Sequence, residues 1–282
     1  MVAMDLSQYE VRWGHGTHLP GVGWSARAQD RVRVELAGPD GFGSLAPLQS
    51  TGTVNPALLD RLVATMCGGF QRRDSAFKFG DLSKNRRGNH YGFIENGVMM
   101  SQLHPGLITA ISYKDGSFDL KAWTDADNAR LPEIRFARQN GVPLIENGRP
   151  GVFVSKWGEG NWSGSESGNL RSSRAAACIS VQNEKRFLIY GYFSSATPNA
   201  MARIFQSYGC RDAIHLDMNS PGQGYFGLIS NARGQVIVEN PIAAMANSNT
   251  KMNLPQGGGQ VQAPRFVGNA DGMDFFYFLR RK

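Results

Sequence analysis

The chain has 282 residues, of which 41% are hydrophobic and only 19% are charged, and its formal net charge is +7. These values exclude an intrinsically disordered chain, which combines low hydrophobicity with high net charge, and the 34 glycines show no collagen-like period of three. No apolar run reaches the roughly 18 residues that a membrane-spanning helix needs. Abundant glycine with few charges is typical of short strands and turns rather than of a helical bundle.

The first predicted elements are short. Alternating apolar and polar residues over 9–13 and 32–36 predict two strands. Asn55 and Pro56 predict the start of a helix, as its N-cap and first helical residue, and leucines at helical spacing extend it through 58–63.

The middle of the chain reads as strands and loops. An apolar segment, 64–70, predicts a strand that ends in a glycine turn. Residues 71–92 are basic and punctuated by glycine, which favours an exposed loop. Two further strands are predicted over 106–113 and 118–123, because Lys114-Asp115-Gly116 between them is a hairpin-turn signal.

The clearest helix of the sequence lies further on. Residues 151–173 are rich in Gly, Ser and Asn and predict a long loop, and 174–193 predict two strands around a turn. Thr197 and Pro198 then predict a helix start, apolar residues follow at helical spacing, and Gly209 is a natural stop.

The last predicted elements are again strands. An apolar strand over 213–217 ends on an acid, and 225–229 and 235–238 flank a turn and predict a hairpin. Residues 247–264 are polar and rich in glycine and predict a mobile loop, whereas 275–279 predict a closing strand.

The order of these elements predicts the fold class. Strands outnumber helices and do not alternate with them regularly, which favours α+β with a mixed, mainly antiparallel sheet and a few packed helices. No segment shows the composition shift of a linker, so we predict one domain over 1–282. Most of the excess positive charge lies in 72–87 and at the C-terminal end, and we interpret both as solvated; we therefore do not expect nucleic acid as the partner.

Cysteine usage bears on metal binding and on location. Cys67, Cys178 and Cys210 have no zinc-binding spacing, and we predict no metal and no cofactor. A disulfide between Cys178 and Cys210 is one alternative, but we expect free buried thiols. The N-terminus lacks the basic and apolar regions of a signal peptide. Two alternatives remain, a cytoplasmic protein or a chain that begins after an export signal.

His215 and Asp217 are the most informative polar pair. They lie two residues apart in a predicted strand, so both side chains point to the same face. An acid at the end of a buried strand is unfavourable unless it is paired or functional. A hydrogen-bonded core histidine and a turn-forming aspartate are the structural alternatives.

Several short segments follow one another in a characteristic order. They are 63–70, 138–140, 144–148, 173–179, 197–209 and 212–219. Together they resemble the phosphodiester glycosidase domain family, which includes a lysosomal enzyme and many bacterial secreted proteins. Cys67-Gly68-Gly69-Phe70 resembles the family's Asn-Gly-Gly-Phe, and Leu216-Asp217-Met218-Asn219 resembles the Leu-Asp-Ile-Asn of a bacterial branch. The likeness spans roughly residues 5–230.

The resemblance implies an activity, a substrate and a location outside the cytoplasm. It implies hydrolysis of the sugar C1–O bond in a sugar-1-phosphodiester, such as a GlcNAc-1-phosphodiester glycan. The leaving phosphate is a weak base and needs little proton donation, so one carboxylate can suffice. We predict Asp217 as nucleophile or base. Arg174 is our candidate to hold the phosphate through its planar fork, and Arg171 is a weaker candidate.

Other residues have predicted substrate-binding roles in this scheme. Backbone N–H groups near Gly68 and Gly69 would form an anion-binding nest beside Cys67. Asn219 would bond sugar hydroxyls, and His215 would assist Asp217.

Two departures from the family pattern favour a different function. Cys67 stands where the family has Asn, and Met218-Asn219 stand where it usually has Gly-Gly. The first alternative is therefore an inactive carbohydrate- or cell-wall-binding module on the same fold. The second is a nucleic-acid binder that uses the basic segment 72–87 and its neighbouring aromatic residues.

Overall fold

The computed structural model describes most of the chain. The described residues are 1–17, 52–70, 91–154, 171–232, 235–253, 260–267 and 269–282. The strand predicted over 32–36, the basic segment 72–87 and most of the loop predicted over 151–173 lie outside them.

Three large sheets build the fold, and every described strand pairing is antiparallel. Sheet A has the order β1 (Val2–Asp5), β12 (Lys185–Ala196), β11 (Ser172–Gln182), β13 (Cys210–Met218), β9 (Ile145–Glu146), β10 (Arg149–Pro150). Sheet B has the order β15 (Gln235–Glu239), β14 (Phe226–Ala232), β3 (Leu62–Cys67), β18 (Phe275–Arg280), β2 (Tyr9–Gly14). Sheet C has the order β5 (Val98–Ser101), β4 (Phe93–Glu95), β8 (Ile134–Gln139), β6 (Ile108–Tyr113), β7 (Phe118–Ala122).

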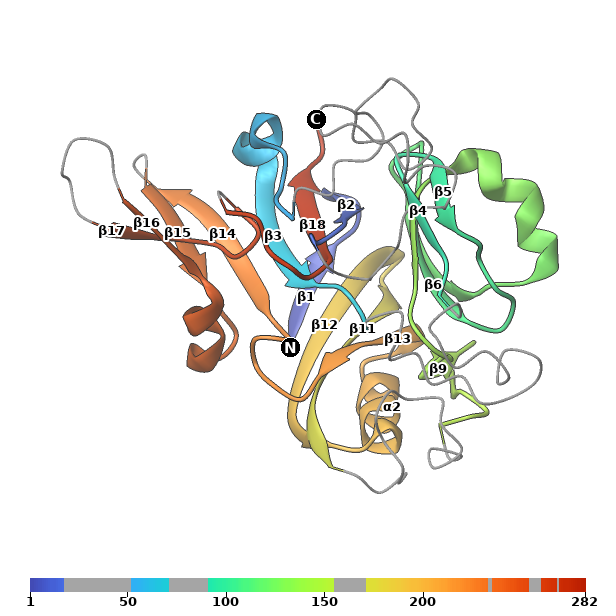
Figure 1. The fold of residues 1–282 in the computed structure, drawn as a ribbon. Helices are drawn as coiled ribbons and strands as arrows, with labels where there is room; N and C mark the ends of the chain where they lie inside the picture. The colour runs from blue at the N-terminus through green and yellow to red at the C-terminus, as the bar shows by residue number, and fades with distance from the viewer. Residues whose placement is uncertain (18–51, 71–90, 155–170, 233–234, 254–259, 268) are drawn as a thin grey trace.

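The sheets are arranged around a common hydrophobic core. Sheet C lies on the right of Figure 1 and sheet B toward the left, and helix α2 (Pro198–Ser207) packs beside sheet A at the bottom. One cluster of buried apolar side chains takes residues from all three sheets, for example Ile179, Phe278 and Phe93. The fold is thus mostly antiparallel β with few helices, which is compatible with the predicted α+β class. The single-domain organisation stays a prediction.

Helix α2 confirms the sequence signals that predicted it. The Thr197 side chain accepts a hydrogen bond from the Ala200 N–H, Pro198 is the first helical residue, and Gly209 has a left-handed φ of 66°. Of the four apolar residues at helical spacing, Met201 and Phe205 are buried against the core, whereas Ile204 and Tyr208 are exposed. The long β11–β12 hairpin and the strand that leads to Asp217 are confirmed as well.

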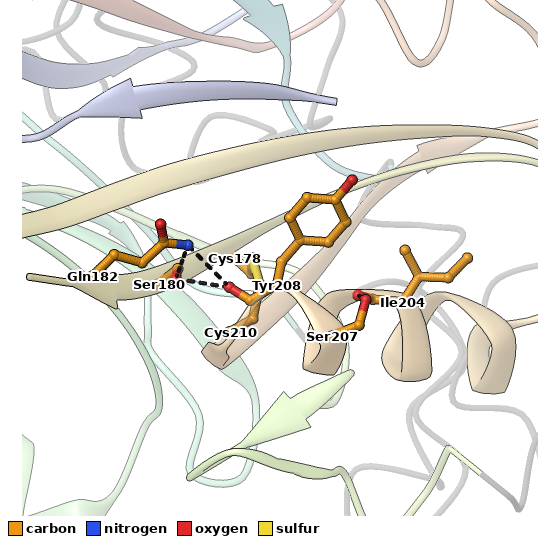
Figure 2. The surroundings of a disulfide bond; sticks show 7 residues. All are labelled: Cys178, Ser180, Gln182, Ile204, Ser207, Tyr208 and Cys210. Atoms are coloured by element: carbon orange, nitrogen blue, oxygen red, sulfur yellow. Dashed lines mark hydrogen bonds between the residues drawn. A yellow bond between two sulfur atoms is a disulfide. The ribbon is translucent and has the colours of Figure 1, made fainter.

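A disulfide joins Cys178 on β11 to Cys210 at the start of β13, so the expectation of free thiols at these two positions is wrong. The register of the two neighbouring strands brings these cysteines together, because Cys178 is paired with Ala213 and Ser180 with Cys210. Figure 2 shows the bond at the end of α2, where the Ser180 hydroxyl donates to the Tyr208 carbonyl at 2.9 Å. Cys67 is free and buried, as predicted.

Removing the disulfide should destabilise the protein. Replacing Cys178 and Cys210 together with alanine should lower the free energy of unfolding by about 2–4 kcal/mol, since a crosslink restricts the unfolded chain. Urea unfolding without reductant measures the change. Reductant should lower the stability of the wild type and leave the double variant unaffected; an unchanged midpoint in the double variant would contradict the expectation.

The start of β3 corrects another prediction. Asn55 does cap a helical turn, because its side chain accepts from the Ala57 N–H at 2.9 Å. That turn is a short 3-10 helix, η1 (Pro56–Arg61), and the strand begins at Leu62 rather than at residue 64. Pairing of Leu62 with Leu279 on β18 extends the strand to this residue in sheet B.

Two further segments differ in detail from expectation. The hairpin predicted around Lys114-Asp115-Gly116 is present as β6 and β7, and a 3-10 helix, η4 (Asp125–Glu133), follows it. The loop predicted over 247–264 instead contains the hairpin of β16 (Thr250–Asn253) and β17 (Gln260–Ala263), after η6 (Ala243–Ser248). The surrounding stretch is polar and rich in glycine, and the alternation Gln260-Val261-Gln262-Ala263 within it is short. The mobility of this segment stays a prediction.

Within the described residues, no helix combines the length and apolar character that a membrane crossing requires.

Candidate functional site

The predicted glycine turn follows β3 and is packed tightly against two other segments. A Cβ on Gly68 would overlap the Asp274 carboxylate, and a Cβ on Gly69 would overlap the Asn140 side chain. Both positions therefore require glycine because of close approach. The Gly68 N–H already donates to the Asp274 carbonyl at 2.8 Å, so it is not available to the predicted anion-binding nest.

A buried arginine–aspartate pair holds this turn. Arg138 and Asp274 lie 2.9 Å apart, with side chains 1% and 0% exposed. The guanidinium also donates to the Phe70 carbonyl at 2.6 Å and to the Gln139 carbonyl at 2.5 Å. The Trp13 indole N–H donates to the same aspartate at 2.8 Å. The pair is thus fully bonded, as buried charges must be.

Asn140 connects the turn to the strand that carries the predicted acid. Its side-chain oxygen accepts from the Phe70 N–H at 2.9 Å, and its amide donates to the carbonyl of His215 on β13. The Phe70 ring packs on the His215 ring with centroids 4.8 Å apart. Segments that are distant in sequence therefore meet at one place.

A bulge in β13 sets the positions of Arg174 and Met218. Ala176 is paired with His215 and Arg174 with Met218, so β13 contains one residue more than β11 over this stretch. The Arg174 guanidinium donates to the Ala196 carbonyl at 2.9 Å and lies 3.1 Å from the Met218 sulfur. Bulges of this kind often redirect side chains next to active sites.

Burial sets the charges of the residues around the bulge. Arg174 is fully buried, and burial lowers the pKa of its guanidinium to about 10, so it is protonated at pH 7. Burial, and then the charge of Arg174, hold the pKa of His215 well below its ordinary 6.5. His215 is therefore neutral at pH 7 and cannot act as a fixed cation.

Asp217 lies beside Cys67. Its side chain is almost buried, at 7% exposure, and one carboxylate oxygen accepts from the Met218 N–H at 2.7 Å. Burial raises the pKa of the Cys67 thiol to about 12; the Arg265 guanidinium opposes this rise and the Asp217 carboxylate adds to it. The acid and the thiol are thus within electrostatic reach of each other. The thiol lies 3.3 Å from the Gly222 carbonyl and donates to it.

Cys67 should be unreactive in the folded protein. With a pKa of about 12 the group stays a thiol below that pH, and the thiolate is the form that reacts. At pH 8, iodoacetamide should leave the native protein unmodified for hours and add one group per chain after unfolding without reductant, as mass spectrometry would detect. Fast labelling of the native protein would contradict the burial of this side chain.

Asn219 and Arg171 are exposed, Asn219 directly after β13 and Arg171 directly before β11. Asn219 is exposed with a left-handed φ of 81°, and its side-chain oxygen accepts from the Ser172 hydroxyl at 3.2 Å. Arg171 is exposed immediately before β11. Of the predicted site residues, the structure gathers six into one buried cluster and leaves these two at its rim. The six are Cys67, Gly68, Gly69, Arg174, His215 and Asp217.

Other polar residues of this cluster, among them Asp274, Arg265 and Asn140, carry no predicted role from the sequence. The signal for Asp274 was weak, since it is a single acid before an aromatic strand. Cavities of about 710 and 370 Å³ lie away from the cluster, the larger between β7 and the ends of β11 and β13, the smaller between β1 and β14. Within the described part of the chain, no three His, Cys, Asp or Glu side chains are grouped to hold a metal ion.

Comparisons with known proteins give a distant likeness. No protein-family model matches the sequence, and no curated protein does. The catalytic domain of zebrafish N-acetylglucosamine-1-phosphodiester alpha-N-acetylglucosaminidase, auto-inhibited by its pro-peptide, is similar at 11% identity and a TM-score of 0.46, over 98% of this chain and 74% of that one. A hypothetical protein from Synechocystis is similar at 13% identity and a TM-score of 0.34, over 83% of this chain and 56% of that one. At TM-scores under 0.5 these likenesses carry no argument about family or activity.

Proposed function

We propose that this protein is a hydrolase that cleaves the sugar C1–O bond of a sugar-1-phosphodiester, with Asp217 as the catalytic carboxylate. The observation that supports the proposal is that Asp217 lies within electrostatic reach of Cys67 and directly before Met218, the residue that is paired with Arg174. Asp274 and Asp271, two other carboxylates of this region, are each paired with an arginine, Arg138 and Arg265. We therefore assign the role of catalytic carboxylate to Asp217.

The reaction needs one carboxylate because the leaving group is a phosphate. Acting as base, Asp217 takes a proton from water, the water oxygen bonds to C1, and the C1–O bond breaks with its electron pair left on the phosphate oxygen. The proton on Asp217 then returns to solvent. Acting as nucleophile, the carboxylate bonds to C1 while the C1–O bond breaks and the phosphate leaves with its electron pair. Water then attacks C1, the bond from C1 to the carboxylate breaks, and the sugar and a proton are released.

The other residues have supporting roles in this proposal. Arg174 is fully buried, so it does not contact the substrate directly. We assign it the role of a fixed positive charge that attracts an anionic substrate through its electric field. His215 is neutral and supports the Phe70 ring. Asn219, exposed at the rim, is the candidate for sugar hydroxyls. The disulfide supports a location in an oxidising compartment outside the cytoplasm.

An inactive carbohydrate-binding module is the second candidate. The observation that favours it is Cys67, whose buried thiol is bonded to the Gly222 carbonyl and leaves no donor for a substrate. The nucleic-acid alternative depends on residues 72–87, which lie outside the described part of the chain.

One assay separates the two candidates. The purified protein is incubated with a chromogenic GlcNAc-1-phosphodiester, and free sugar and calorimetric binding are both measured. Release of sugar supports the hydrolase. Binding without release supports the binding module, and neither binding nor release contradicts both.

A further inference from the structure

Arg265 and Asp271 form a second arginine–aspartate pair, next to Cys67 at the start of the glycine turn. The guanidinium donates to both carboxylate oxygens, from Nε at 2.6 Å and from Nη2 at 3.0 Å. The side chains are 13% and 19% exposed, so the pair is largely shielded from solvent. A two-point bond of this kind fixes the plane of the guanidinium.

The remaining nitrogen of Arg265 joins two segments next to Asp217. Nη1 donates to the Gly222 carbonyl at 2.5 Å and lies 3.4 Å from the Cys67 sulfur. Gly222 belongs to the turn that follows Asp217 on the chain, and Cys67 begins the glycine turn. The Cys67 thiol also donates to the Gly222 carbonyl. The guanidinium, the thiol and this carbonyl are therefore in mutual contact.

The surroundings of Arg265 keep its side chain in this orientation. Its guanidinium lies over the Phe266 ring at 4.9 Å and near the Tyr225 ring at 5.9 Å. Its backbone N–H donates to the Tyr225 hydroxyl at 3.2 Å, and its carbonyl accepts from the Thr65 hydroxyl at 3.2 Å. The arginine is thus held from sheet B at both its backbone and its side chain.

We propose that Arg265, oriented by Asp271, is a positioning residue for the site around Asp217, because it ties the Gly222 turn to Cys67. The role in turnover rests on the proposed hydrolase function, whereas the tie between the two segments does not. Arg265 lies outside residues 5–230, so the family resemblance does not supply it. Lysine carries the same charge but lacks the planar fork, and it should restore the tie only in part.

The test uses the full chain with Arg265→Met, Arg265→Lys and a matched control, Arg186→Met. Arg186 also pairs with an aspartate, Asp119, at 2.8 Å, but both of its groups are exposed and distant from the cluster. Two properties are measured in each variant at pH 8, the rate of Cys67 alkylation and kcat and KM for the phosphodiester. Circular dichroism identifies variants that fold.

In Arg265→Met, Cys67 should be alkylated at least about tenfold faster, because loss of the bond to Gly222 lets the turn move and exposes the thiol. The lost charge alone raises the pKa of the thiol and would slow alkylation, so a faster rate reports exposure. The kcat should fall at least about tenfold with little change in KM, since hydrogen bonds to a charged group are lost. Arg265→Lys should be intermediate, and the control should match the wild type. Folded Arg265 variants with wild-type alkylation and kcat would overturn the proposal. If Arg265→Met does not fold, Arg265→Lys decides by the same two measurements. If the wild type has no turnover, faster alkylation still supports the tie, and only the hydrolase function fails.

Discussion

Replacing Asp217 with asparagine should lower kcat for a GlcNAc-1-phosphodiester by roughly 10³-fold or more, a typical loss when a catalytic carboxylate is removed. Asparagine has nearly the same shape, but its amide neither accepts a proton from water nor attacks C1. Its oxygen can still accept from the Met218 N–H, as the carboxylate does at 2.7 Å. The fold should therefore survive, and the loss should be in kcat.

Asp212→Asn is the matched control for this experiment. Asp212 lies on the same strand, β13, and its carboxylate accepts from the Asn147 N–H at 3.1 Å, away from the cluster. This variant should keep wild-type kcat. Equal turnover by Asp217→Asn and the wild type would remove Asp217 from the mechanism, and with it the central assignment of the proposed function.

Breaking the buried pair of Arg138 and Asp274 should cause the largest loss of stability. Asp274→Asn leaves the Arg138 charge buried without its counterion, and such a change costs about 3–5 kcal/mol of unfolding free energy. Urea unfolding measures the loss. A drop below about 1 kcal/mol, the range of exposed pairs, would show that the pair does not hold the turn.

Two further variants separate this effect from a general loss of packing. The double variant Arg138→Met/Asp274→Asn removes both charges and should lose less than the sum of the single variants, because no charge is left unpaired. Glu133→Gln breaks an exposed pair with Arg130 at 2.9 Å and should change stability by less than about 1 kcal/mol. A double variant as unstable as the sum would instead indicate independent effects.

Local signals in the sequence predicted the local features of the fold. Thr197, Pro198 and Gly209 define α2 because capping and left-handed backbone are properties of single residues. The apolar run at Leu62 and Val63 predicts a helix, although such a run fits either structure; the pairing of Leu62 with Leu279, far along the chain, places both residues in β3. The Cys178–Cys210 bond likewise depends on the register of two strands, which composition and spacing do not reveal.

The candidate site also contains residues with a local signal in the sequence and residues without one. Asp217 was selected because an acid after an apolar strand is unusual in itself, and the glycine turn because its sequence resembles a family motif. Asp274 and Arg265 were not selected, because their significance lies in partners far along the chain, Arg138 and Cys67. Such pairs follow from tertiary structure and leave no local signal.

The position of β18 within sheet B has a consequence for how the protein is made. This strand lies between β3 and β2, so a strand that follows them by about 200 residues or more fills the gap between them. During translation, the edges of β2 and β3 that pair with β18 stay unpaired until β18 is made. Arg138 likewise lacks its counterion until Asp274, the residue just before β18, is made. Assembly through such distant contacts is slow and leaves strand edges open to aggregation. The site should therefore form only after β18 has left the ribosome, and a chaperone that shields β2 and β3 should raise the yield of folded protein.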